Sequence, residues 1–320
     1  MMTASCAVAG FFAAILFASD RPPTTGGNPA TWSSKQAAAY LDDRMNWWMG
    51  WPLAARDHDT FCVSCHTVAP YGLARPLLRT ALGEQAPSVT EQKVIDNVTK
   101  RVRLWHEVAP FYPDEKRGFP KTSESRGTEA VLNALILAAH DAPTRRLSAE
   151  ARLAFDNMWE EQLKTGDDAG AWPWLQFHNA PWEGDSQYYG AALAAVAVGI
   201  APGGYGFEAA IQNGLKLLSG YLARNGDSQI LIDRVTLLWA STGVPGLLTQ
   251  AQKQSVIDAA LDRQQPDGGF SLSGFGGSWK RKDGTTLDTR SDGYATGLVT
   301  LALLDAGLAP SDARLTRSLA

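Results

Sequence analysis

The sequence is poor in the residues that build metal centres and disulfide frameworks. Its 320 residues include only three cysteines, five histidines and five methionines. Three cysteines, one of them at position 6, cannot supply a disulfide framework that replaces a hydrophobic core. Stability must therefore come from the apolar residues, which make up 45% of the chain and suffice for one large domain.

The chain also lacks an excess of charge of one sign. It has 29 basic and 33 acidic residues, scattered along the sequence, with a net charge of -4. Proteins that bind nucleic acids or anionic membranes concentrate basic side chains on one face. We therefore expect neither kind of partner.

No run of apolar residues is long enough to predict a membrane span in the mature chain. The run over residues 4–18 is short and ends in small residues before Asp20, which is typical of a secretory signal. It lacks the usual preceding lysine or arginine, so the true start codon is open. Cys6 lies at the beginning of the run, where a lipid anchor is not expected.

These features predict a signal peptide over residues 1–19, and export to the periplasm or beyond. The rest of the chain, residues 30–320, is predicted to form a single domain.

A Cys-x-x-Cys-His motif is the strongest chemical signal in the sequence. Cys62 and Cys65 have the spacing that adds two thiols to the vinyl groups of a haem, and His66 can then reach the iron. A zinc site would need a second pair of soft ligands, and a thioredoxin-like dithiol would need a βαβ pattern; both are missing. An unrelated pair of structural cysteines is the third alternative. We predict one covalent haem c within residues 58–70, with His66 as its proximal ligand.

The sequence does not identify the ligand on the other face of the iron. His106, which follows Trp105, is the preferred distal candidate because a loop of this length can return to the haem. A structural histidine is the alternative at that position. If no strong ligand binds, the iron is free for peroxide, oxygen or small-gas chemistry. The other candidates in the mature chain are Met45, Met49, His58, His140, Met158 and His178.

Beyond the motif, apolar and amphipathic helical patterns alternate, and no period-two strand pattern appears. Helices that are apolar nearly all round are predicted to be buried on most sides. They cover residues 71–82, 128–142, 186–201, 230–241 and 294–309. Amphipathic helices, expected on the outside, cover residues 36–51, 147–164, 207–224 and 250–265. Glycine-rich turns with an aromatic residue follow several of the outer helices.

Two of these turns carry a family resemblance. The segments EEQLKTGDDAGAW at 160–172 and DRQQPDGGF at 262–270 resemble the Gln-Trp repeats of terpenoid cyclases, including squalene-hopene cyclase, and of prenyltransferase β subunits. The similarity covers roughly residues 145–310. It implies an all-α fold, an α/α toroid of inner and outer helix pairs around a cavity, with the haem segment near its mouth. A generic helical-pair repeat is the alternative.

The active residues of that family do not carry over. The Asp-x-Asp-Asp acid motif is absent, so a type II terpene cyclase is not expected, and no cysteine remains to hold a prenyltransferase zinc ion. Glu183 and Asp185 are the nearest acid candidates, but carboxylates at a helix start are more often caps. Asp292 and Glu129 occupy similar predicted helix starts, which favours capping.

Three functions remain. The first is electron transfer, in which the chain exchanges electrons with a redox partner protein. The alternative is a haem oxidoreductase of peroxidase or oxygenase type, acting on a hydrophobic, perhaps isoprenoid, substrate. The third is a cyclase-like protein that binds an apolar ligand. Aromatic residues around one inner-helix start are candidates to line such a pocket: Trp172, Trp174, Trp182, Tyr188 and Tyr189.

Overall fold

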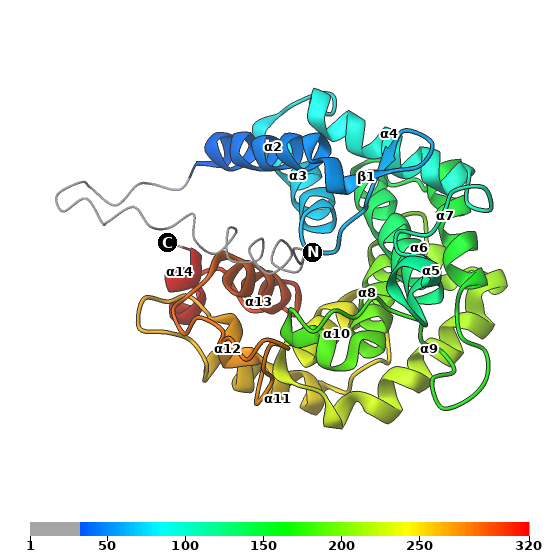
Figure 1. Cartoon of the computed structure of the whole chain (residues 1–320). Helices are drawn as coiled ribbons and strands as arrows, with labels where there is room; N and C mark the ends of the chain where they lie inside the picture. The colour runs from blue at the N-terminus through cyan, green and yellow to red at the C-terminus, as the bar shows by residue number, and fades with distance from the viewer. Residues whose placement is uncertain (1–32, 320) are drawn as a thin grey trace, which may run out of the picture. The chain divides into compact units, whose positions relative to one another are not determined.

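The computed structural model describes residues 33–319, and Ser33–Ala320 form one compact unit (Figure 1). The predicted signal peptide at residues 1–19 lies outside the described residues. Within the described part, the chain is all-α, as the sequence predicts. No helix there is long and apolar enough to cross a membrane.

The helices follow one another with short connections. The longer ones are α2 (Ser34–Gly50), α3 (Val68–Leu82), α4 (Val89–Arg103), α6 (Lys121–Asp141), α7 (Ala149–Glu160), α8 (Ser186–Ile200), α9 (Gln212–Asn225), α10 (Leu231–Gly243), α11 (Gln250–Leu261) and α13 (Gly293–Asp305). The shorter ones are α5 (Asp114–Arg117), α12 (Leu272–Phe275) and α14 (Ala313–Leu319). The strands β1 (Ala55–Arg56) and β2 (Thr60–Phe61) form one small antiparallel hairpin.

Helices α4, α7 and α11 begin where the sequence offers a capping side chain. Ser88 accepts a hydrogen bond from the third residue of α4, and Ser148 does the same for α7. Thr249 and Gln252 form a reciprocal capping box at the start of α11. Each cap satisfies backbone N–H groups that have no partner within the helix.

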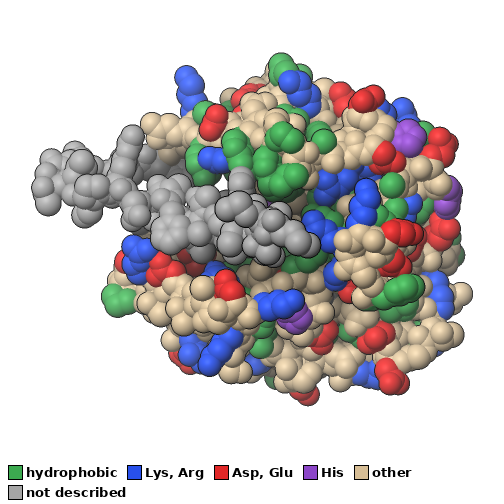
Figure 2. Space-filling model, in the orientation of Figure 1, with side chains coloured by type: hydrophobic (Ala, Val, Ile, Leu, Met, Phe, Trp, Pro, Cys, Tyr) green, Lys and Arg blue, Asp and Glu red, His purple; other side chains and the backbone are tan. Residues whose placement is uncertain are grey.

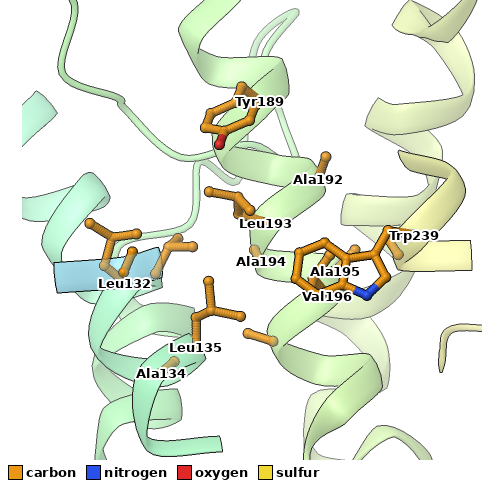
Figure 3. Close-up of a cluster of buried hydrophobic side chains, with 14 of the residues drawn as sticks. Leu132, Ala134, Leu135, Tyr189, Ala192, Leu193, Ala194, Ala195, Val196 and Trp239 are labelled. Carbon is orange, nitrogen blue, oxygen red and sulfur yellow. The ribbon is translucent and has the colours of Figure 1, made fainter. Parts of the chain in front are cut away.

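Five helices form a consecutive series in space. Helix α3 packs against α6, α6 against α8, α8 against α10 and α10 against α13. A second set of helices packs against this series: α2 packs on α3, α7 on α6, α9 on α8, α11 on α10 and α14 on α13. Figure 3 shows the apolar side chains that meet between α6, α8 and α10. On the outside, Figure 2 shows acidic and basic side chains interspersed over the face in view.

Helices α8 and α10 approach each other so closely that their backbones touch. A Cβ atom on Gly243 would lie 2.5 Å from the Cα atom of Gly199. Only glycine fits at such a crossing. These two residues therefore fix where the two helices meet.

The two Gln-Gly turns make equivalent contacts. Gln162 donates to the carbonyl of Gly170 in its own turn and to a carbonyl of α9, at 3.2 and 3.0 Å. Gln264 donates to the carbonyl of Gly268 and to a carbonyl of α14, at 3.0 and 2.7 Å. Both glycines have positive φ angles, of 107° and 89°, and lie against the backbone of the next outer helix. In each case the glutamine joins one outer helix to the next.

Several predicted boundaries needed correction. Helix α6 begins at Lys121, well before residue 128, so Glu129 lies within the helix rather than at its start. Helix α9 begins at Gln212 because short 3₁₀ turns occupy residues 205–211. The small β1–β2 hairpin lies where no strand pattern was found, since two-residue strands are too short to show alternation.

Candidate functional site

The Cys-x-x-Cys-His motif lies in the segment between β2 and α3, and its backbone is held from three sides. The Cys62 N–H donates to the carbonyl of Ala54 at 2.8 Å, and its carbonyl accepts from the Trp48 indole at 2.9 Å. The Asn97 side chain bonds both the N–H and the carbonyl of Phe61, at 2.8 and 3.1 Å. These bonds fix the backbone of the motif to α2 and α4.

A buried ion pair strengthens this support. Arg101 of α4 and Glu129 of α6 form a bidentate pair, and both side chains are fully buried. Arg101 also donates to the Thr60 hydroxyl at 2.7 Å, in the strand that leads into the motif. A buried charge pair is tolerated when all its hydrogen-bonding capacity is used. The pair thus joins the hairpin to two helices.

The motif's own side chains lie in surroundings that favour their neutral forms. Cys62 and Cys65 are free thiols, and burial raises their pKa values to about 11 and about 12. Burial lowers the pKa of His66 to about 4, so the imidazole is neutral near pH 7. Its Nδ1 lies 3.0 Å from the Thr67 hydroxyl, and its ring meets the edge of Trp48. Such a second bond orients a histidine that binds a metal through its other nitrogen.

An apolar cavity of about 550 Å³ adjoins the motif. It lies between the five helices of the consecutive series, and the side chain of Cys65 forms part of its wall. Its other lining residues are Leu41, Ala69, Pro70, Leu73, Ala74, Leu77, Leu135, Ala139, Ala142, Tyr189, Leu193, Ile200, Trp239, Gly293, Tyr294, Gly297, Leu298, Leu301 and Asp305. Figure 3 shows four of them, Leu135, Tyr189, Leu193 and Trp239, as they project from α6, α8 and α10.

The cavity has two different ends. Cys65, Tyr189 and Tyr294 lie at the amino ends of the helices, and the two tyrosine hydroxyls are 3.0 Å apart. At the carboxyl ends, the Trp239 indole donates to the Asp305 carboxylate at 2.9 Å. The walls between them are almost entirely aliphatic, so the cavity suits an elongated apolar molecule.

The aromatic residues singled out in the sequence do gather here, but they divide in role. Tyr189 lines the cavity, and Trp182 stacks on it from outside, with ring centroids 5.5 Å apart. Trp174 meets the edge of Tyr189. Trp172 and Tyr188 are fully buried and point to neighbouring outer helices, where they bond the carbonyls of Met158 and Leu222.

The carboxylates of Glu183 and Asp185 accept hydrogen bonds from backbone N–H groups. The Glu183 carboxylate accepts from the N–H groups of residues 177, 179 and 180, and so closes the loop before α8. Asp185 is the N-cap of α8 and also accepts from Gln229 at 2.9 Å. Asp292 caps α13, whereas Glu129 caps nothing and is the partner of Arg101. Capping thus holds for Asp185 and Asp292.

The structure places His106 away from the cavity. Its side chain is 75% exposed, and its Nε2 lies 3.8 Å from the Glu160 carboxylate. His58 and His178 are also exposed, and His140 is half-buried near the end of α6. Within residues 33–319, no histidine or methionine side chain lines the cavity.

Two further residues of note escaped the sequence analysis. Tyr294 was read as the first residue of an inner helix, and its pairing with Tyr189 spans 105 positions of sequence. Asp233 of α10 is fully buried, and neither of its carboxylate oxygens has a partner within the described part. Burial raises its pKa well above the ordinary value for aspartate. Only the tertiary fold reveals either arrangement.

Among residues 33–319, no group of three or more His, Cys, Asp and Glu side chains is arranged to hold a metal ion. Comparison with known proteins found no matching family model, no matching curated protein and no matching solved structure.

Proposed function

We propose that the chain is an exported c-type haem protein that acts as an oxidoreductase on an apolar molecule held beside the haem. The observation that carries this proposal is the position of Cys65, which belongs both to the attachment motif and to the cavity wall. A haem bound to this thiol is therefore adjacent to any molecule in the cavity.

The residues present fit such a group. Two free thiols have the attachment spacing, and the adjoining His66 is neutral and oriented through Nδ1. Cys62 and Cys65 would hold the haem, and His66 would bind its iron. When bound, the haem supplies one-electron and oxygen chemistry. The chain's own contribution is to hold the motif rigid, to exclude water with aliphatic walls and to orient the ligand.

We also propose that the helices form an α/α toroid like that of the terpenoid cyclases. Support comes from the alternation of inner and outer helices, the equivalent Gln162 and Gln264 turns, and the cavity enclosed by the inner series. The absence of an Asp-x-Asp-Asp motif separates this chain from the cyclases in chemistry.

Electron transfer with a redox partner protein is the second candidate, and a specific contact favours it. The Trp48 ring lies 5.5 Å from that of His66, and it continues to Trp51 at 5.4 Å. Trp51 stacks on Trp47, whose exposed fraction is 37%. This aromatic series runs from the iron ligand to the surface and would carry electrons to a partner docked on α2.

The test is expression in a periplasm that contains haem-maturation machinery. We expect the intact mass to increase by one haem, and the increase to disappear in Cys62→Ser with Cys65→Ser. We expect a high-spin spectrum that changes with carbon monoxide, since no histidine or methionine of residues 33–319 lines the cavity. His106→Ala should leave this spectrum unchanged.

Other outcomes separate the candidates. A low-spin spectrum that is indifferent to carbon monoxide would favour the electron carrier. A change from low spin to high spin in His106→Ala would make that residue the distal ligand. An intact mass without haem would overturn the proposal.

A further inference from the structure

The amino end of the cavity carries a donor with no partner in the described structure. Tyr189 and Tyr294 contribute two hydroxyl protons, and the bond between their oxygens uses one. Burial raises the pKa of both phenols, which keeps them protonated. Trp182 stacks on the Tyr189 ring at 5.5 Å and packs at a tilt against the Tyr294 ring at 5.0 Å, which holds both in place. The second proton is available to an oxygen atom of a ligand.

The carboxyl end has the opposite electrostatic character. Leu77, Ile200, Trp239 and Asp305 line the cavity near the carboxyl ends of α3, α8, α10 and α13. Helix carboxyl ends bear partial negative charge and stabilise cations rather than anions. The exposed Asp305 carboxylate adds a full negative charge. No lysine, arginine or histidine of residues 33–319 lines the cavity, so a carboxylate or phosphate held there would lose its hydration without a cationic partner.

The distance between the two ends sets the length of the ligand. On α8 the lining runs from Tyr189 to Ile200, which corresponds to about 16 Å at the helical rise of about 1.5 Å per residue. Leu193 lies between them, and between the two ends the facing walls on α3 and α13 are lined by leucine, alanine, proline and glycine. Within the described residues, these side chains offer van der Waals contact and no further hydrogen bond.

We propose that the cavity selects an uncharged, elongated apolar molecule with one terminal hydroxyl or carbonyl oxygen, which accepts a hydrogen bond from the Tyr189–Tyr294 pair. It discriminates against carboxylates and phosphates of the same length. This inference rests on the ligand cavity of the proposed function and is independent of whether a haem is attached. The bound oxygen would lie beside Cys65, at the end where the haem is expected.

The experiment compares two probes of equal length, decan-1-ol and decanoate, by calorimetric titration of the full protein carrying its haem. We expect decan-1-ol to bind at least tenfold more tightly than decanoate. The double variant Tyr189→Phe with Tyr294→Phe keeps the rings and should lose about three- to tenfold in decan-1-ol affinity, the worth of one neutral hydrogen bond.

Tyr221→Phe is the matched control, because Tyr221 is an equally buried tyrosine on α9 that does not line the cavity. It should bind decan-1-ol as the wild type does. Equal or tighter binding of decanoate would overturn the inference, as would unchanged binding in the double variant. Failure of decan-1-ol to bind a protein that carries haem would also overturn it. An intact mass without haem would contradict only the proposed haem attachment.

Discussion

Gly297 of α13 is a position where the cavity can be filled without displacing a neighbouring atom. It lines the cavity, and a Cβ atom built on it meets nothing within 4 Å in residues 33–319. Glycine inside a helix costs about 1 kcal/mol relative to good helix formers. We expect Gly297→Leu to raise the free energy of unfolding by about 0.5–1 kcal/mol and to lower decan-1-ol affinity at least tenfold.

The stability change is measured by urea unfolding followed by circular dichroism, and the affinity by calorimetry. Gly190→Leu is the contrasting variant, because a Cβ atom on Gly190 would lie 2.3 Å from the Trp174 ring. It should lose about 2–3 kcal/mol through overpacking. If Gly297→Leu is destabilised to the same extent, or binds the probe as the wild type does, the space beside α13 is not a ligand cavity and the reasoning fails.

Three further predictions concern stability. Glu129→Gln breaks the buried ion pair and should cost about 3 kcal/mol in urea unfolding, whereas Glu208→Gln, in an exposed pair, should cost less than about 1 kcal/mol. The raised pKa of Asp233 means that the folded state keeps a proton the unfolded chain loses, so the unfolding free energy should fall as pH rises above about 4. Asp233→Asn should remove that fall in a pH series of urea melts; an unchanged slope would show another group to be responsible. Gly243→Ala should lower the melting temperature by several degrees, because its methyl group would meet the α10–α8 crossing.

Much of the helical architecture was predictable because buried helices leave a strong pattern. The apolar runs gave α8, α10 and α13 to within a few residues. Helix α4 was missed, since its apolar positions are few and lie among lysines and arginines. The early start of α6 was missed because its first two turns, from Lys121, are polar in sequence. Its buried glutamate is explained only by an arginine on another helix.

The candidate site was predictable only where it is local in sequence. The motif from Cys62 to His66 is contiguous, so spacing alone identified it. Distal and cavity residues depend on contacts between distant segments, for which sequence offered only loop length as a guide. Loop length favoured His106, whereas the structure exposes it beside a glutamate. Tyr294 was not identified as a site residue because its hydrogen-bond partner, Tyr189, lies far away in the sequence.

The hydrogen bonds that hold the Cys-x-x-Cys-His backbone have a consequence for biogenesis. Cys62 is only 5% exposed, and its peptide group is bonded to Trp48 on an earlier helix. Asn97, which clamps the residue before it, belongs to a helix translated later. Little of the Cys62 side chain is therefore accessible once the chain has folded. If a haem is attached as proposed, we expect the attachment to precede the docking of α4.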